Sequence, residues 1–171
     1  MASLFTSRCL LQPPGEHDRD GLIALATDLT VRGFLGGPRE DTAAMASADA
    51  LVAGSPHSLA WAVRLRDQSE AGCIGLVVIG PHHDDRLPEL SYQFLPAYWG
   101  RGLALECTEA VLRHAFDSLS LPRLVSETQA ANRASRRLLE RLGMRKARTV
   151  ERFGAAQIIY EIANPLSPVR P

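Results

Sequence analysis

Gly100, Arg101 and Gly102 stand where the sequence changes from an extended pattern to a helical one. The predicted helix begins at Leu103, so the backbone N–H groups of its first turn have no partner within the helix. The helix dipole favours negative charge at this end, and glycine lets an anionic group come close to the backbone. The spacing is therefore typical of a phosphate-binding turn. Glycines between a strand and a helix also serve as plain turn residues, and that interpretation stays open.

Two familiar phosphate-binding signatures do not match this turn. No Lys-Ser or Lys-Thr pair follows the glycines, which excludes a P-loop. A dinucleotide-binding turn would need a third glycine where Leu105 stands. The residues around the turn must therefore identify the phosphate ligand.

A strand and two helices are predicted around this turn. Alternating residues predict a strand over Glu89–Leu95, and Pro96 ends it because proline has no N–H to donate to a neighbouring strand. Apolar residues at steps of four predict a helix over Leu103–Leu119. Another helix is predicted to follow Asn132, which can cap it, with Ser135 at the third helical position.

The other elements complete the predicted fold. Strands are predicted over residues 8–12, 58–65, 73–79, 124–129, 144–153 and 156–162, and helices over residues 16–29 and 41–52. Asp41 can cap the second of these helices. Hairpins at both ends, with strand–helix–strand units between them, predict an α/β fold with a sheet of mixed direction. We expect one domain over residues 1–163 and a loose tail over residues 164–171.

Composition and charge limit the classes of function. A hydrophobic content of 46% over 171 residues is ordinary for a globular protein. Nineteen basic residues balance nineteen acidic ones, so no bulk charge is available for binding nucleic acid. No segment is long and apolar enough for a signal peptide or a membrane span. Cys9, Cys73 and Cys107 have no metal-ligand spacing and are predicted to be buried free thiols in a cytoplasmic protein.

One loop carries residues that could bind a metal. His82, His83, Asp84 and Asp85 are consecutive in the sequence. Neighbouring ligands on a loop seldom fit one site, so we expect a solvated loop and no metal.

Three stretches together resemble the GNAT superfamily of N-acetyltransferases, and most of all its RimJ/RimL branch. They are the run Tyr92–Ala104 around the glycine turn, the pattern Asn132-x-x-Ser135, and the run Leu138–Met144. The resemblance covers essentially the whole chain. It implies a GNAT-like central sheet that is mixed, mostly antiparallel and flanked by helices. That sheet would be splayed between its fourth and fifth strands, at residues 89–95 and 124–129.

The resemblance implies acetyl-CoA as the cosubstrate. Its pyrophosphate would lie on the backbone N–H groups of four residues, Arg101, Gly102, Leu103 and Ala104. Gly100, like Gly102, would allow close approach. Trp99 stands where the superfamily commonly has Gln or Arg, which removes one phosphate-binding side chain.

The same resemblance implies where the pantetheine arm of acetyl-CoA binds, which is along the strand predicted over Glu89–Leu95. The pantetheine arm would pair with this strand at Phe94 and Leu95, and the Asn132 amide would hold it. A backbone N–H near Phe94 or Leu95 would polarise the thioester carbonyl.

The resemblance also implies the catalytic residues. Many GNAT enzymes have a tyrosine acid where Leu139 stands here. Ser135 matches the serine that the RimJ/RimL branch uses near the sulfur; the alternative is that it only helps to cap its helix. Glu89 and Glu151 are the candidate bases, although either could be an exposed edge residue. A base is not strictly required, because entry into a cleft can lower the pKa of an amine.

These observations favour an acetyl-CoA-dependent N-acetyltransferase. The acetyl group would pass to a primary amine, on a protein N-terminus or a small molecule, by direct attack on the thioester. The alternative is a non-catalytic acyl-CoA-binding module. A doubly wound enzyme for another phosphate ligand is disfavoured by the hairpins at both ends. We expect a monomer or homodimer with no nucleic-acid or membrane partner.

Overall fold

The computed structural model describes residues 2–68 and 72–165, and its strands form one sheet of eight. The strands are β1 (Leu4–Phe5), β2 (Cys9–Gln12), β3 (Leu59–Leu65), β4 (Gly75–Pro81), β5 (Pro88–Phe94), β6 (Arg123–Gln129), β7 (Arg145–Arg152) and β8 (Ala155–Ala163). The α-helices are α1 (Arg19–Thr27), α2 (Asp41–Ala53), α3 (Leu103–Asp117) and α4 (Arg133–Arg141). The short 3-10 helices are η1 (Glu16–Asp18), η2 (Val31–Phe34) and η4 (Pro96–Tyr98).

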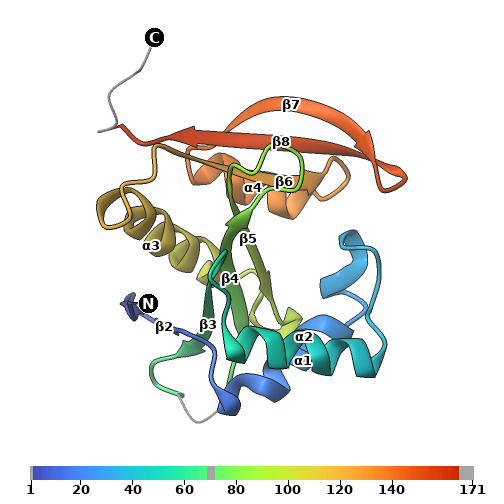
Figure 1. Cartoon of the computed structure of the whole chain (residues 1–171), viewed down its shortest axis with the longest axis vertical. Helices are drawn as coiled ribbons and strands as arrows, with labels where there is room; N and C mark the ends of the chain where they lie inside the picture. The colour runs from blue at the N-terminus through green and yellow to red at the C-terminus, as the bar shows by residue number, and fades with distance from the viewer. Residues whose placement is uncertain (1, 69–71, 166–171) are drawn as a thin grey trace.

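The sheet runs in the order β1-β2-β3-β4-β5-β6-β8-β7 (Figure 1). Every neighbouring pair is antiparallel except β5 and β6, which are parallel and meet at a single registered pair, Glu89 and Val125. Beyond that pair the two strands separate toward their carboxyl ends. The prediction of a mixed, mostly antiparallel sheet splayed between these two strands is confirmed.

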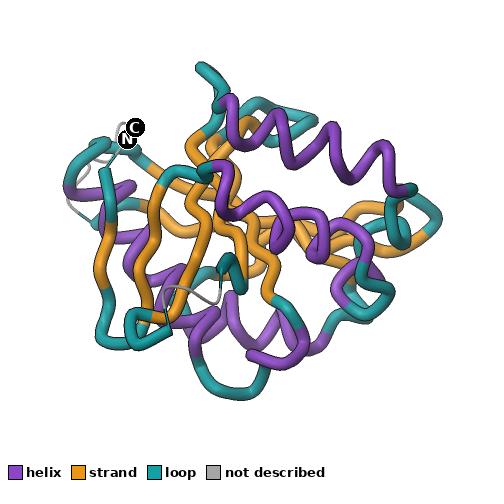
Figure 2. The backbone as a smooth tube through the Cα atoms, turned by 90° about the horizontal axis from the view of Figure 1, so that it is seen from below, coloured by secondary structure: helices purple, strands orange, loops and turns teal. Residues whose placement is uncertain are grey.

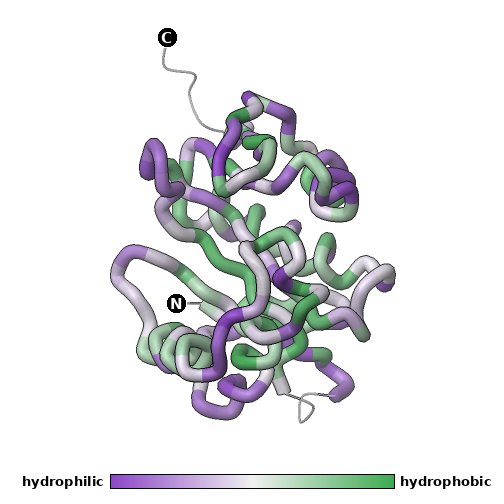
Figure 3. Tube along the Cα trace, turned by 90° about the vertical axis from the view of Figure 1, so that its right-hand side faces the viewer, coloured by the Kyte–Doolittle hydropathy of each residue, from purple (hydrophilic) through white to green (hydrophobic). Residues whose placement is uncertain are grey.

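Helices cover both faces of the sheet (Figure 2). Side chains alternate along β3, so Trp61 and Val63 join a core with α3 and α4, whereas Ala60 and Ala62 join a second core with α1 and α2. Hydrophobic residues accordingly concentrate at the centre of the molecule, with hydrophilic residues around it (Figure 3). The buried stripes of α3 and α4 anchor both helices beside the splayed strands.

Several details differ from the sequence predictions. Glu40, rather than Asp41, stands at the N-cap of α2, and no side-chain hydrogen bond caps this helix. Asn164 is not part of a loose tail, because it is buried and donates its backbone N–H to the Pro122 carbonyl at 2.8 Å. Residues 166–171, the rest of the predicted tail, lie outside the described residues.

Cys9, Cys73 and Cys107 are buried and free, as predicted. The structure adds that Cys9 on β2 and Cys107 on α3 belong to the same core, which their spacing in the sequence does not reveal. Within residues 2–68 and 72–165, no helix has the length and apolar character needed to cross a bilayer.

Candidate active site

Two adjoining cavities open where β5 and β6 separate. The large cavity, of about 670 Å³, lies between β5, β6, α4, the η2 segment and the turn that joins β7 to β8. The small cavity, of about 280 Å³, lies between the glycine turn, α3 and α4. Five residues line both, so the two spaces are continuous: Phe94, Trp99, Ala104, Ala134 and Leu138.

The small cavity contains the glycine turn that opened the sequence analysis. Gly100 and Gly102 have φ angles of 71° and 76°, a conformation that glycine adopts more readily than other residues. The first N–H to bond within α3 is that of Glu106, which donates to the Gly102 carbonyl. The three preceding helical N–H groups therefore lack a helical partner. The turn has the geometry of an anion site.

Side chains would fill this space if the glycines were replaced. A Cβ at Gly100 would meet nothing within 4 Å, and a Cβ at Gly102 would meet only the Arg8 Nη2 atom, at 3.5 Å. Both positions border or adjoin the small cavity, so a larger side chain would take up volume that a phosphate needs. The space beside both glycines is therefore compatible with a bound phosphate.

Two arginines complete the small cavity from α4. Arg137 and Arg141 line it, one helical turn apart on the face toward α3. Both residues are exposed, and helical periodicity alone does not show that α3 begins opposite them. Guanidinium groups beside a helix N-terminus suit the charge of a phosphate.

An acidic residue in the first turn of α3 is neutralised by a neighbour. Glu106 accepts hydrogen bonds from the backbone N–H of Arg8 at 2.8 Å and from its Nε at 2.7 Å. Partial burial acts to raise the pKa of Glu106, but hydrogen bonds from Thr6, Arg8 and Ser7 outweigh it and lower the pKa to about 2. Arg8 thus offsets the negative charge that would oppose an anion.

At the end of β5, two successive backbone N–H groups face opposite sides. The Leu95 N–H donates to the Ile74 carbonyl at 3.0 Å, so Leu95 cannot serve as predicted, and it lines neither cavity. Successive backbone groups in a strand point to opposite sides, so the Phe94 N–H faces the gap toward β6. Trp99 Nε1 donates to the Phe94 carbonyl at 2.6 Å and holds the glycine turn against this strand end.

Asn132 caps α4, as predicted. Its Oδ1 accepts a hydrogen bond from the Ser135 backbone N–H at 3.1 Å, and both residues line the large cavity. The Asn132 Nδ2 group therefore remains as a donor toward the cavity. Ser135 thus takes part in the cap through its backbone N–H, and its hydroxyl is left for another partner.

The Ser135 hydroxyl instead meets Tyr92 of β5, with an Oγ–Oη distance of 2.8 Å. Burial raises the pKa of Tyr92 to about 12, so its phenol stays protonated and can donate to Ser135. The sequence analysis missed Tyr92, because strand alternation gives its face but not its partner on α4. Leu139, at the position of the missing tyrosine acid, is fully buried in the core.

The two candidate bases lie in different environments. Glu89 lines the large cavity and accepts the Glu127 backbone N–H at 3.4 Å, and burial raises its pKa. Glu151 is exposed on β7 and lines neither cavity. The next residue, Arg152, turns inward to Glu127, and alternation along the strand therefore turns Glu151 outward. The structure removes Glu151 as a candidate base.

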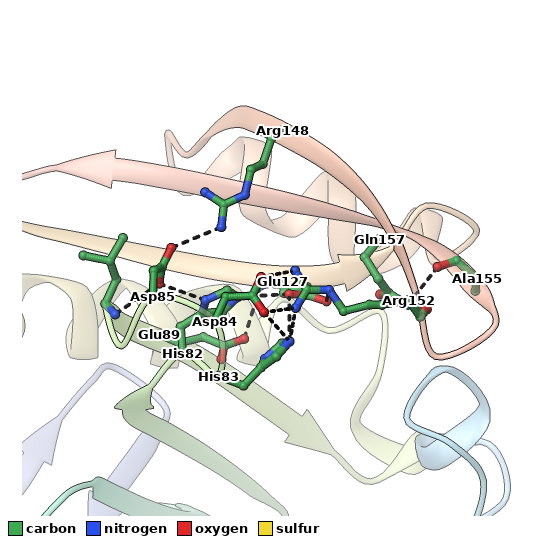
Figure 4. A network of polar contacts seen from close by, with 11 residues as sticks. His82, His83, Asp84, Asp85, Glu89, Glu127, Arg148, Arg152, Ala155 and Gln157 are labelled. Atoms are coloured by element: carbon green, nitrogen blue, oxygen red, sulfur yellow. Dashed lines mark hydrogen bonds and ion pairs between the residues drawn. The ribbon is translucent and has the colours of Figure 1, made fainter.

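His83, Asp84 and Asp85 are exposed, as predicted for a solvated loop, but His82 is not, and all four belong to one polar network (Figure 4). His82 is fully buried, with Nδ1 2.9 Å from Asp85 Oδ1 and Nε2 3.0 Å from Glu127 Oε2. Burial acts to lower the pKa of His82, but the hydrogen bonds to Glu127 and Asp85 outweigh it and raise the pKa. The partners of His82 come partly from β6, 45 positions later, which the loop sequence alone cannot reveal.

Ion pairs extend this network to β7. Arg152 binds Glu127 through Nε at 3.3 Å and both carboxylate oxygens of Asp84 at 2.7 and 2.6 Å. Donor atoms of His82, His83 and Glu127 lie within 4.8 Å of one another, a spacing that a metal could use. The Arg152 guanidinium already contacts His83 and Glu127, and a cation in that position makes the cluster an ion-pair network.

The fold and the two cavities define a class of enzyme. Residues 8–145 match the acetyltransferase (GNAT) domain family, so the chain belongs to that family and is an acyltransferase. This membership leaves the non-catalytic alternative without support.

Three similar proteins extend the match. The uncharacterized N-acetyltransferase YoaA of Bacillus subtilis is 26% identical over 155 residues, covering 88% of this chain and 86% of its own. A GNAT-family acetyltransferase from Bacillus anthracis superposes with a TM-score of 0.81 at 19% identity, covering 95% and 99% of the two chains. Spermidine N-acetyltransferase from Vibrio cholerae, solved with CoA and spermine, superposes with a TM-score of 0.79 at 17% identity, covering 92% and 96%.

Proposed function

We propose that this enzyme is an N-acetyltransferase that moves an acetyl group from acetyl-CoA to a primary amine. The observation that carries the proposal is the continuity of the two cavities. The small cavity offers backbone N–H groups and two arginines to a phosphate, and the large cavity offers a half-buried carboxylate, Glu89, to an amine. Between them lie Phe94 and Ser135, where a thioester would have to react.

Acetyl-CoA would supply an activated acetyl group as its thioester. The residues of the small cavity fit its pyrophosphate, because Gly100 and Gly102 leave room and positive charge surrounds them. The Phe94 backbone and the Asn132 Nδ2 group would hold the extended pantetheine arm along the gap between β5 and β6. Arg101, Leu103 and Ala104 contribute backbone groups at the start of α3.

Glu89 is the base in this proposal. An incoming ammonium must lose a proton before its nitrogen can attack a carbonyl carbon. The raised pKa of Glu89 makes its carboxylate a better proton acceptor than an exposed glutamate, and its position on the cavity wall lets it meet the amine.

The other groups act on the thioester. The Phe94 N–H would donate to the carbonyl oxygen as negative charge develops there. Tyr92 would orient the Ser135 hydroxyl so that its own proton points into the cavity, toward the leaving sulfur. A hydrogen bond from Ser135 would stabilise the thiolate without transferring the phenol's proton.

Assignment to the RimJ/RimL branch is part of the proposal. Ser135 and Trp99 stand at positions where that branch has the same residues, and the branch acts on protein N-termini and small amines. We further propose a cytoplasmic monomer or homodimer.

The proposal is tested by mixing purified protein, acetyl-CoA and a panel of primary amines and peptides, and by measuring thiol release. We expect release that depends on the amine and yields an acetylated product by mass spectrometry. Release at the same rate with and without every amine would contradict the proposal.

A further inference from the structure

The large cavity has little negative charge that is not already paired. Two carboxylates and one imidazole line it, from Glu89, Glu127 and His83. Glu127 is bound by Arg152 and His82, at 3.3 and 3.0 Å, and only 8% of its side chain is exposed. Glu89 has no ion-pair partner among residues 2–68 and 72–165. Among the described residues, Glu89 is therefore the carboxylate of the cavity that has no ion pair, and the His82 and His83 imidazoles act on it only through space. It can bind one positive charge.

The mouth of the same cavity is apolar. Phe34, the last residue of η2, and Leu35, which follows it, are 40% and 44% exposed, and Phe153, at the turn between β7 and β8, is 78% exposed. Exposed large apolar side chains that gather at one cavity mark a binding surface more often than isolated ones do. These three residues come from opposite walls, so an apolar group at the mouth would contact both.

Local contacts hold both walls in place. The Gln129 side-chain amide donates to the Phe34 carbonyl at 3.2 Å, which ties the η2 segment to β6. The Phe153 ring lies against His83 with a centroid distance of 5.6 Å, and His83 also contacts Arg152. The apolar mouth is therefore fixed relative to the strand that carries Glu127.

Among the described residues that line the cavity, a second positive charge on the acceptor would meet no unpaired carboxylate, only the weak attraction of the Phe34 and Phe153 rings. An ammonium beside Phe34, Leu35 or Phe153 would lose part of its hydration without gaining a carboxylate. The nearest other carboxylate of the cavity, Glu127, is already neutralised by a guanidinium. The spermidine N-acetyltransferase of Vibrio cholerae shares the fold of this chain at 17% identity, which carries no information about the acceptor.

We propose that the acceptor is a primary amine with one positive charge and an apolar group attached to it, and not a polyamine. This inference rests on the proposed function. The ammonium meets Glu89 at the base of the cavity, and the apolar group lies between Phe34, Leu35 and Phe153 at its mouth.

Hexylamine and 1,6-diaminohexane test this directly, because they have the same length and differ by one terminal ammonium. We expect kcat/KM for hexylamine to exceed that for the diamine by tenfold or more. Equal values, or a preference for the diamine, would overturn the inference while leaving N-acetyltransfer intact. Acetylation of other amines with no activity on hexylamine would also overturn it. Amine-independent thiol release would instead overturn the proposed function together with the inference.

A charge placed at the mouth gives a second test. Phe34→Glu should shift the ratio of kcat/KM values toward the diamine by tenfold or more. Leu29→Glu is the matched control, because Leu29 is 74% exposed just before the η2 segment and lines neither cavity. Calorimetry should show that both variants keep the acetyl-CoA affinity of the parent protein. An unchanged ratio in a Phe34→Glu protein with normal donor affinity would overturn the inference.

Discussion

The small and the large cavity are built in different ways. One stretch of sequence, within residues 94–105, makes the small cavity together with one face of α4. The groups proposed to bind the phosphate there are mainly the backbone N–H groups at the start of α3. The large cavity collects side chains from β5, β6, α4, the η2 segment and the β7–β8 turn. Donor recognition is therefore encoded locally, whereas acceptor recognition is assembled by the tertiary structure.

The chemistry of the two cavities follows this difference. A backbone site tolerates many side-chain changes, provided that the glycines keep their φ angles and leave room. A site made of side chains can change its ligand preference when one residue is replaced. Substitution of Phe34 or Glu89 should therefore alter which acceptor is used. Variants of each cavity should therefore separate donor binding from acceptor turnover.

Gly102→Val should have the largest effect on the small cavity. The new side chain would occupy the phosphate's position, and we expect acetyl-CoA to bind about 100-fold more weakly, a loss of ~2.7 kcal/mol. Calorimetry measures this affinity. Gly54→Val is the control, because Gly54 has the same φ of 76° and ends α2, outside both cavities. Equal donor affinity in the two variants would remove the phosphate-binding assignment of the turn.

Ser135→Ala should lower the rate of acetyl transfer, because Ser135 lies where the two cavities meet. We expect the rate at saturating acetyl-CoA to fall about 30-fold, or ~2 kcal/mol, with little change in donor affinity. Tyr92→Phe should lower the rate about tenfold, because the Ser135 hydroxyl would lose its fixed orientation. In the Ser135→Ala background, Tyr92→Phe should have no further effect. Additive losses would show that Tyr92 does not act through Ser135.

Arg137→Ala should have the smallest effect of the three. The guanidinium faces the small cavity but is exposed, so we expect donor affinity to fall about threefold to tenfold, or ~1 kcal/mol, and less at high salt. Arg133→Ala is the control, because Arg133 is exposed on the same helix and lines neither cavity. Titrations at low and high salt give the comparison. An equal loss of acetyl-CoA affinity in both variants would show that the effect comes from the overall positive charge of the protein and not from the position of Arg137.

The sequence predicted the locally encoded part well. Strand alternation, Pro96 and the glycine turn predicted β5 and the start of α3, and Asn132 was predicted correctly as the cap of α4. Each of these features depends on residues a few positions apart, so periodicity and turn chemistry were enough to find them.

The remainder depends on contacts between distant residues. His82 is buried because Glu127, 45 positions later, and Asp85 satisfy both ring nitrogens, which a loop of consecutive polar residues does not reveal. Tyr92 and Ser135 are 43 positions apart, and their contact depends on how α4 packs over the separated strands. Glu151 and Glu89 looked equivalent as acids near strand ends. The cavity lining and the ion pair of Arg152 with Glu127 show that Glu89 faces the cavity and Glu151 does not.

The central claim is that Glu89 serves the acceptor and not the donor. In Glu89→Gln, we expect the second-order rate constant for an active amine to fall about 1,000-fold, within the usual range for loss of a general base. The acetyl-CoA affinity measured by calorimetry should stay unchanged. The parent protein should lose activity as pH falls toward and below the raised pKa of Glu89, because protonation removes the base. The loss of activity should therefore begin at a higher pH than it would for an exposed glutamate. Glu89→Gln should not show this pH-dependent loss. A Glu89→Gln protein with normal turnover and the parent's acidic limb, or one with weakened donor binding, would contradict the account.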